Sequence, residues 1–174
     1  MKGRHNKVTT FERFNHDKFL RHPSTWAFFV SVGFFAVAFL VYFLMPFVKS
    51  LYVLTVVSLS VFVGLSIFGL AKEIFTKSYD YSYMSVGVMG LSLLTLMIAG
   101  QTAEFVTMYV SFIFALCAIP FAIIGIVKVL KKNEDRVKIV MNAMVILGSL
   151  VYLFFVGFVI VFVEVARTGN NMGW

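Results

Sequence analysis

The chain has 174 residues, of which 60% are hydrophobic and 13% charged, and its mean hydropathy is +0.93. A water-soluble domain of this length cannot bury so much apolar surface, so the composition excludes a soluble fold and predicts an integral membrane protein. The formal net charge of +7 arises from fifteen Lys and Arg against eight Asp and Glu. Thirteen of those fifteen fall in three short stretches before or between apolar runs.

Residues 1–25 form a basic arm that carries eight charges and lacks the apolar region of a signal peptide. The stretch TTFE fits a capping box, with Thr9 as N-cap and Glu12 three residues later. Three phenylalanines then share one broad helical face before Pro23 ends the segment. This pattern favours a short amphipathic helix on the inner membrane surface, in contact with anionic lipid headgroups, and the alternative is a disordered basic tail.

Five apolar segments follow, and each approaches the ~20 residues that a helix needs to cross ~30 Å of hydrocarbon. The third is the shortest, and it rises only about 25 Å as a helix. The predicted fold is therefore all-α, a polytopic bundle of five transmembrane helices over residues 26–174. The predicted segments are 26–48, 51–71, 84–100, 105–127 and 139–163.

The distribution of Lys and Arg predicts the orientation, because cytoplasmic loops carry the excess of these residues. With the N-terminus inside, only Lys49 and Arg167 fall on the outer side. We therefore expect a cytoplasmic N-terminus, an external C-terminus and a location in the cell (plasma) membrane. The basic run KKNEDRVK is then a cytoplasmic loop rather than a nucleic-acid patch, with Asn133 as N-cap and Glu134 and Asp135 in the first turn of the last helix.

Asp, Glu, Lys, Arg and His are absent from all five predicted segments, although ion paths and catalytic sites in membranes usually depend on them. Glu104 and Glu164 stand at the outer edges, and they either flank an external polar site for a cation or belong to a solvated rim. His5, His16 and His22 lie in the arm at a spacing that does not suit shared metal ligation, so we expect them to face solvent or lipid. We expect no catalytic residue, no metal site, no cofactor and no enzymatic activity.

Small residues form a stripe on the fourth segment, at spacings of 4, 4, 3, 4 and 3. They fall within one helical face about 80° wide, and Pro120 lies on the opposite side, where a kink is expected. Small residues let membrane helices approach closely, so this face is predicted to pack within the bundle or against another subunit. Similar faces hold Ser66 and Gly69 on the second segment and Ser85 and Ser92 on the third. The stripe consists of Thr107, Ser111, Ala115, Ala118, Ala122 and Gly125.

The packing faces and the missing catalytic groups favour a non-catalytic membrane subunit or accessory protein. It would assemble as a homo-oligomer or with a larger membrane-protein partner, and no nucleic-acid partner is expected. The alternative is a homo-oligomeric channel or small-solute transporter, which rows of Ser and Thr would suit. An intramembrane enzyme is a third and weaker hypothesis, because such chemistry needs ionisable groups within the membrane.

Overall fold

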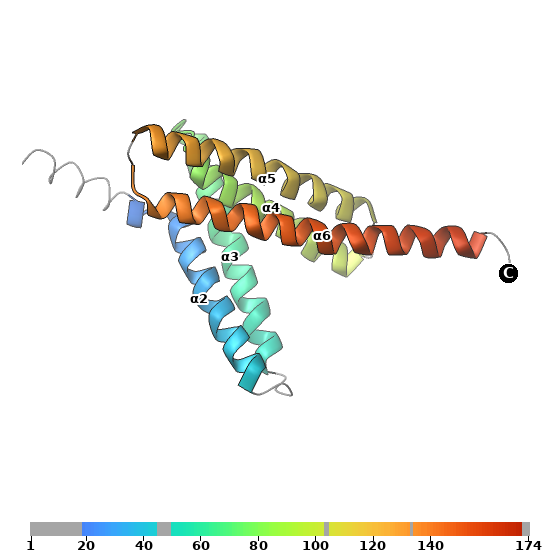
Figure 1. Ribbon diagram of the computed structural model, residues 1–174. Coiled ribbons are helices and arrows are strands. Elements are labelled where there is room, and N and C mark those ends of the chain that lie inside the picture. The colour runs from blue at the N-terminus through green and yellow to red at the C-terminus, as the bar shows by residue number, and fades with distance from the viewer. Residues whose placement is uncertain (1–18, 45–49, 103–104, 133, 172–174) are drawn as a thin grey trace, which may run out of the picture.

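The computed structural model describes residues 19–44, 50–102, 105–132 and 134–171, and these residues contain five long α-helices (Figure 1). The predicted all-α fold is confirmed for this part of the chain. The amphipathic helix predicted in the arm lies outside the described residues, apart from 19–25. The five helices are α2 (Pro23–Leu44), α3 (Ser50–Phe75), α4 (Tyr81–Thr102), α5 (Phe105–Lys132) and α6 (Val137–Asn171).

Four of the helices are long and apolar enough to cross a membrane, which makes the chain a multi-pass helical membrane protein. The short third segment is part of a 22-residue helix, because the Tyr-rich sequence before it is also helical. The helices extend beyond the predicted segments, so Glu73 and Lys138 lie on helices rather than in loops. The candidate spans are Val53–Phe75, Tyr81–Gln101, Val106–Lys132 and Val137–Thr168.

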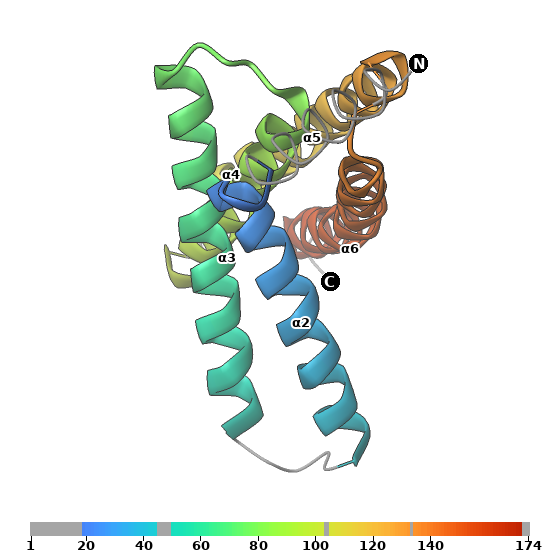
Figure 2. The ribbon, with the colours of Figure 1, turned by 90° about the vertical axis from the view of Figure 1, so that its left-hand side faces the viewer.

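Helix α4 lies at the centre of the bundle. It packs most extensively against α5, and it also contacts α3, α6 and α2. Helices α2 and α3 pack together as a hairpin that diverges from α4, α5 and α6, so the two groups form a V (Figures 1 and 2). The start of α2, the ends of α3 and α5, and the starts of α4 and α6 lie at the closed end of the V, which we call the polar end.

Glycine and serine bring the helices of the V into close contact. Where α2 crosses α3, a Cβ added to Gly69 would lie 1.8 Å from Ser24 Oγ. Where α3 crosses α4, a Cβ added to Gly90 would lie the same 1.8 Å from Ser66 Oγ. Lipid supplies no hydrophobic drive for helix association, so such close packing between small residues is what holds membrane helices together.

The small-residue stripe of α5 faces α4 and α6. Ser111 Oγ donates a hydrogen bond to the Ser92 carbonyl at 2.7 Å, and Ser92 Oγ donates in return to the Ser111 carbonyl at 2.9 Å. Thr107 is half-buried. Contacts within the chain therefore occupy most of this face, and a role of the stripe in oligomer formation stays a prediction. The buried members are Ser111, Ala115, Ala118, Ala122 and Gly125.

Replacement of Ala118 or Ala122 by Leu is expected to lower the free energy of unfolding by about 2 kcal/mol each, because overpacking a filled interior costs about 1–3 kcal/mol. Both alanines are fully buried. Ile113→Leu is the control, since its side chain on the same helix is 56% exposed. Phe121, which lies on the same side of α5 as Pro120, is not a suitable control, because its ring stacks on Tyr81 at a centroid distance of 6.2 Å and its replacement would remove that contact. Thermal unfolding in detergent tests this, and a wild-type Tm for both Leu variants would contradict it.

Candidate functional site

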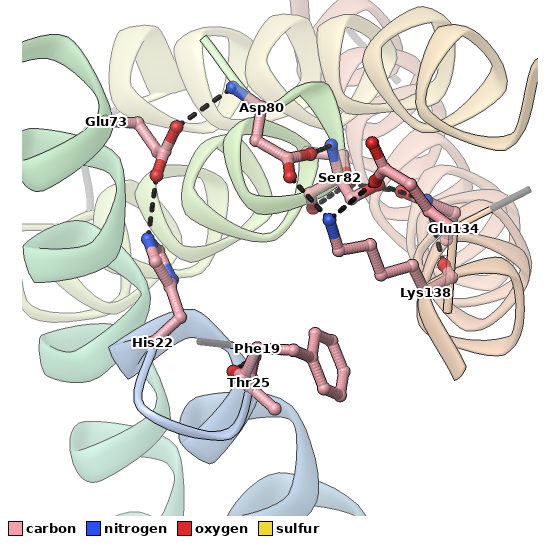
Figure 3. Close-up of polar contacts among 10 residues, drawn as sticks. Phe19, His22, Thr25, Glu73, Asp80, Ser82, Glu134 and Lys138 are labelled. Carbon is pink, nitrogen blue, oxygen red and sulfur yellow. Dashed lines mark hydrogen bonds and ion pairs between the residues drawn. The ribbon is translucent and has the colours of Figure 1, made fainter. Parts of the chain in front are cut away.

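Polar side chains at or next to the ends of four helices, α2, α3, α4 and α6, meet at the polar end (Figure 3). They are joined by a continuous series of hydrogen bonds and ion pairs, which we call the polar network. Its members come from residues before α2, at the end of α3, at the start of α4 and at the start of α6. The network consists of His22, Glu73, Asp80, Ser82, Ser85, Glu134, Lys138 and Asn142.

His22 caps the N-terminus of α2 and joins it to α3. Its Nδ1 accepts the Ser24 amide hydrogen at 3.3 Å, so the proton of the neutral imidazole lies on Nε2, which donates to Glu73 Oε1 at 2.8 Å. The Tyr83 ring stacks on the imidazole at a centroid distance of 3.6 Å. His22 and Glu73 are buried, at 7% and 3% exposure. The expectation that His22 faces solvent or lipid is therefore wrong, because Glu73 on α3 supplies a buried partner.

The turn between α3 and α4 places Asp80 beside Glu73. Helix α3 ends in a Schellman motif, in which the Ser78 amide donates to the Glu73 carbonyl and the Lys77 amide donates to the Ile74 carbonyl, both at 3.2 Å. Lys77 takes the left-handed conformation that this motif requires, with φ of 50°. The reversed chain then brings the Asp80 amide to Glu73 Oε2 at 2.9 Å.

Asp80 caps α4 and joins it to α6. Its Oδ1 accepts the Ser82 amide hydrogen at 3.0 Å, as an N-cap carboxylate does, and its Oδ2 accepts Lys138 Nζ at 2.8 Å. Lys138 also donates to Glu134 Oε2 at 2.9 Å. The Lys138 side chain is only 12% exposed, so both of its carboxylate partners are needed to compensate the burial of its charge.

The loop before α6 differs from its prediction. Helix α6 begins at Val137, so Glu134 and Asp135 precede its first turn instead of lying in it. The Asp135 carboxylate accepts the Val137 amide hydrogen at 3.1 Å and so caps the helix. The predicted N-cap, Asn133, lies outside the described residues.

Asn142 extends the network into the interior and is fully buried. Its Nδ2 donates to Ser82 Oγ at 2.8 Å, and its Oδ1 accepts from Ser85 Oγ at 3.0 Å. Helix α5 approaches this amide through Gly125, where an added Cβ would lie 2.9 Å from Asn142 Nδ2. The last member of the small-residue stripe therefore makes room for the polar network.

A cavity of about 280 Å³ lies beside the network. Lys128 and Lys132 of α5 line it together with acidic members of the network, so its wall carries both signs of charge. Glu73 and Asp80 use both of their carboxylate oxygens in bonds within the chain. Within the described ranges, no group of three or more His, Cys, Asp or Glu is placed to hold a metal ion. The arrangement clamps helix ends together.

The external polar site remains a prediction. Glu104 lies outside the described residues, and its pairing with Glu164 stays a prediction. Glu164 is half-buried and accepts a hydrogen bond from Tyr109 of α5 at 3.3 Å.

Comparisons with known protein families, with characterised proteins and with solved structures give no match. The functional inference therefore rests on the residues and geometry of this chain.

Mild acid is expected to destabilise the fold through His22. Burial lowers the pKa of His22 below its ordinary value, and the neighbouring Glu73 opposes this only in part. Lys72 lowers that pKa further and Asp80 raises it. Because the unfolded chain binds this proton more tightly, the contribution of His22 to stability is fully present above about pH 6.5 and is lost as the pH drops from there through the folded-state pKa.

Unfolding temperatures at pH 7.5 and pH 5.5 test this dependence. His22→Asn is the matched variant, because Asn retains a capping side chain and does not titrate. The wild type is expected to lose more of its Tm on acidification than His22→Asn does. Equal losses in the two proteins would show that His22 is not the responsible group.

Proposed function

We propose that the chain crosses the cell (plasma) membrane five times, with α2 as the first span and the polar end in the cytoplasm. Helix α3 is long and apolar enough to cross the membrane. Helix α2 packs against α3 as a hairpin, so each end of α2 lies beside an end of α3. Among the described Lys and Arg, all but Arg167 lie at helix ends or loops that belong to the polar end. This charge distribution supports a cytoplasmic polar end and an external C-terminus.

An apolar groove of about 730 Å³ runs between the two arms of the V. Its walls come from α2, α3, α4 and α6 and are made almost entirely of aliphatic and aromatic side chains. Two serine hydroxyls in the wall are turned to their own helices: Ser31 Oγ donates to the Phe28 carbonyl at 2.8 Å, and Ser58 Oγ donates to the Leu54 carbonyl. A surface of this kind suits a hydrophobic segment within the membrane.

We propose that the protein is a non-catalytic subunit or accessory protein that binds a hydrophobic transmembrane segment in this groove. The groove is the observation that carries the proposal. The polar network supports it, because a clamp at the closed end fixes the angle at which the arms diverge. A homo-oligomeric channel or small-solute transporter is less well supported, since the hydroxyls of Ser92 and Ser111 that would suit a polar path bond to each other's helices.

Photocrosslinking in native membranes tests the proposal. A photoreactive phenylalanine analogue at Phe62 or Leu147 lies in the groove wall, and the same analogue at Ile123 on α5 is the control, because Ile123 is 49% exposed and outside the groove. The expected result is a protein adduct of defined mass from the groove positions and none from Ile123. Adducts with lipid alone at all three positions would overturn the proposal.

A further inference from the structure

We propose that the segment seated in the groove is α6 of a second copy of this chain, an inference that rests on the proposed function and names its partner. Helix α6 has 35 residues. At 1.5 Å per residue it is about 52 Å long, well beyond the ~30 Å of hydrocarbon that a span must cross. Figure 1 shows its C-terminal part continuing past the N-terminal end of α5, where Tyr109 still bonds to Glu164, so the last turns of α6 extend beyond α5.

Exposed apolar residues recur on α6 at spacings of 4, 3, 4, 3 and 4. A repeat of 3.5 residues keeps side chains on one face of a left-handed helix pair, and membrane helix pairs commonly adopt this crossing. All of these residues are exposed, the three phenylalanines by 64–66%. We call this set the α6 seam, and it consists of Met144, Gly148, Val151, Phe155, Phe158 and Phe162.

The seam and the groove are parts of one surface. Met144, Gly148, Val151 and Phe155 all line the groove, so a helix that packs on the seam also enters the groove. A Cβ added to Gly148 would meet nothing within 4 Å, which leaves open space beside the α6 backbone. Glycine at such a point lets a second helix approach closely.

Charge and area are both compatible with a second copy. The seam carries no charge, because all six of its members are apolar. The nearest charged side chains of α6 have partners in their own chain: Lys138 binds the polar network, and Glu164 accepts a hydrogen bond from α5. An aromatic side chain offers roughly 150–250 Å², so the exposed two-thirds of the three seam phenylalanines amount to roughly 400 Å² per copy. Two copies together with the groove walls can thus reach the ~1,200 Å² that stable interfaces bury.

Two copies inserted with the same orientation place their α6 helices parallel. A two-fold axis along the membrane normal then brings each seam residue next to its counterpart in the second copy. Residues elsewhere on the exposed side of α6 stay apart in this arrangement. Leu150, for example, is 53% exposed but lies about 100° around the helix from Val151 and about 80° from Phe158, at 100° per residue.

Disulfide crosslinking in native membranes distinguishes these faces. In a Cys117→Ser background, Val151→Cys and Phe158→Cys report the seam, while Leu150→Cys is the control. With copper phenanthroline and oxygen as oxidant, the two seam positions are expected to give a covalent dimer of the 19.6 kDa chain at least about fivefold more efficiently than the control. Equal crosslinking at all three positions, or none at the seam, would overturn the dimer.

Gly148→Leu provides a second test. A Cβ added at Gly148 meets nothing within 4 Å, so the variant is expected to retain the wild-type Tm while crosslinking through Val151→Cys falls to the control level. Undiminished crosslinking would contradict the seam. If the photocrosslinked partner is instead a protein of different mass, the proposed function survives and the dimer is excluded; if no protein is captured, both fail.

Discussion

Lys138→Met is expected to lower the free energy of unfolding by about 3 kcal/mol or more, because removing one partner of a buried ion pair leaves an uncompensated charge. Lys138 Nζ lies 2.8 Å from Asp80 Oδ2 and 2.9 Å from Glu134 Oε2. Without Lys138, the Asp80 carboxylate still accepts the Ser82 amide hydrogen at the start of α4. It has lost its cationic partner, however, while it still lies next to Glu73. The link between the starts of α4 and α6 is lost with it.

Two further variants make this prediction specific. Lys132→Met removes an exposed lysine from the same end of the bundle and is expected to change stability by less than about 0.5 kcal/mol. Asp80→Asn added to Lys138→Met is expected to restore part of the loss, since Asn also caps a helix and carries no charge. Unfolding is followed by circular dichroism in detergent. A Lys138→Met protein as stable as Lys132→Met would show that the network does not hold the helices together.

Gly90→Leu is expected to cost about 3 kcal/mol, at the upper end of the range for overpacked interiors. Its Cβ alone would lie 1.8 Å from Ser66 Oγ and 2.9 Å from Ser66 Cβ, so α3 and α4 must separate to admit any side chain. Because this crossing joins the α2–α3 hairpin to the rest of the protein, the angle of the V is expected to change with it.

Gly100→Leu is the matched control on the same helix, because a Cβ added there meets nothing within 4 Å. It is expected to be neutral or slightly stabilising, since replacing a helical glycine removes a penalty of about 1 kcal/mol. The yield of folded protein and the Tm of both variants give the comparison. Similar values for Gly90→Leu and Gly100→Leu would mean that α3 and α4 do not cross at Ser66.

The helices and one of their packing faces could be predicted from the sequence, because both depend on local patterns. Hydropathy identifies spans from neighbouring residues alone, and a 3–4 spacing places Ala118 and Ala122 on one face wherever the helix goes. The ends of the helices were predicted less well. A turn such as that around Lys77 depends on backbone hydrogen bonds that hydropathy does not report, and the helix before it runs on past Glu73.

The polar network could not be predicted, because its partners are distant in sequence. His22 and Glu73 are 51 residues apart, and Asp80 and Lys138 are 58 apart. Local signals existed at single positions, since His22 precedes a proline that can begin a helix and Asp80 precedes the apolar pattern of α4. These signals indicate which residues begin a helix, but not which residues of another helix they pair with. The pairs form only where helices distant in sequence pack together, as they do where Gly69 meets Ser24 and Gly90 meets Ser66.

Sided cysteine labelling tests the central claim most directly, namely that five spans place the polar end in the cytoplasm and the C-terminal end of α6 outside. In a Cys117→Ser background, Arg21→Cys and Ser78→Cys probe two exposed sites at the polar end, and Thr168→Cys probes the far end of α6. The account predicts that an impermeant maleimide labels Thr168→Cys in intact cells, and labels Arg21→Cys and Ser78→Cys only in everted vesicles. Labelling of Thr168→Cys and Ser78→Cys from the same side, or of Arg21→Cys and Ser78→Cys from opposite sides, would contradict it.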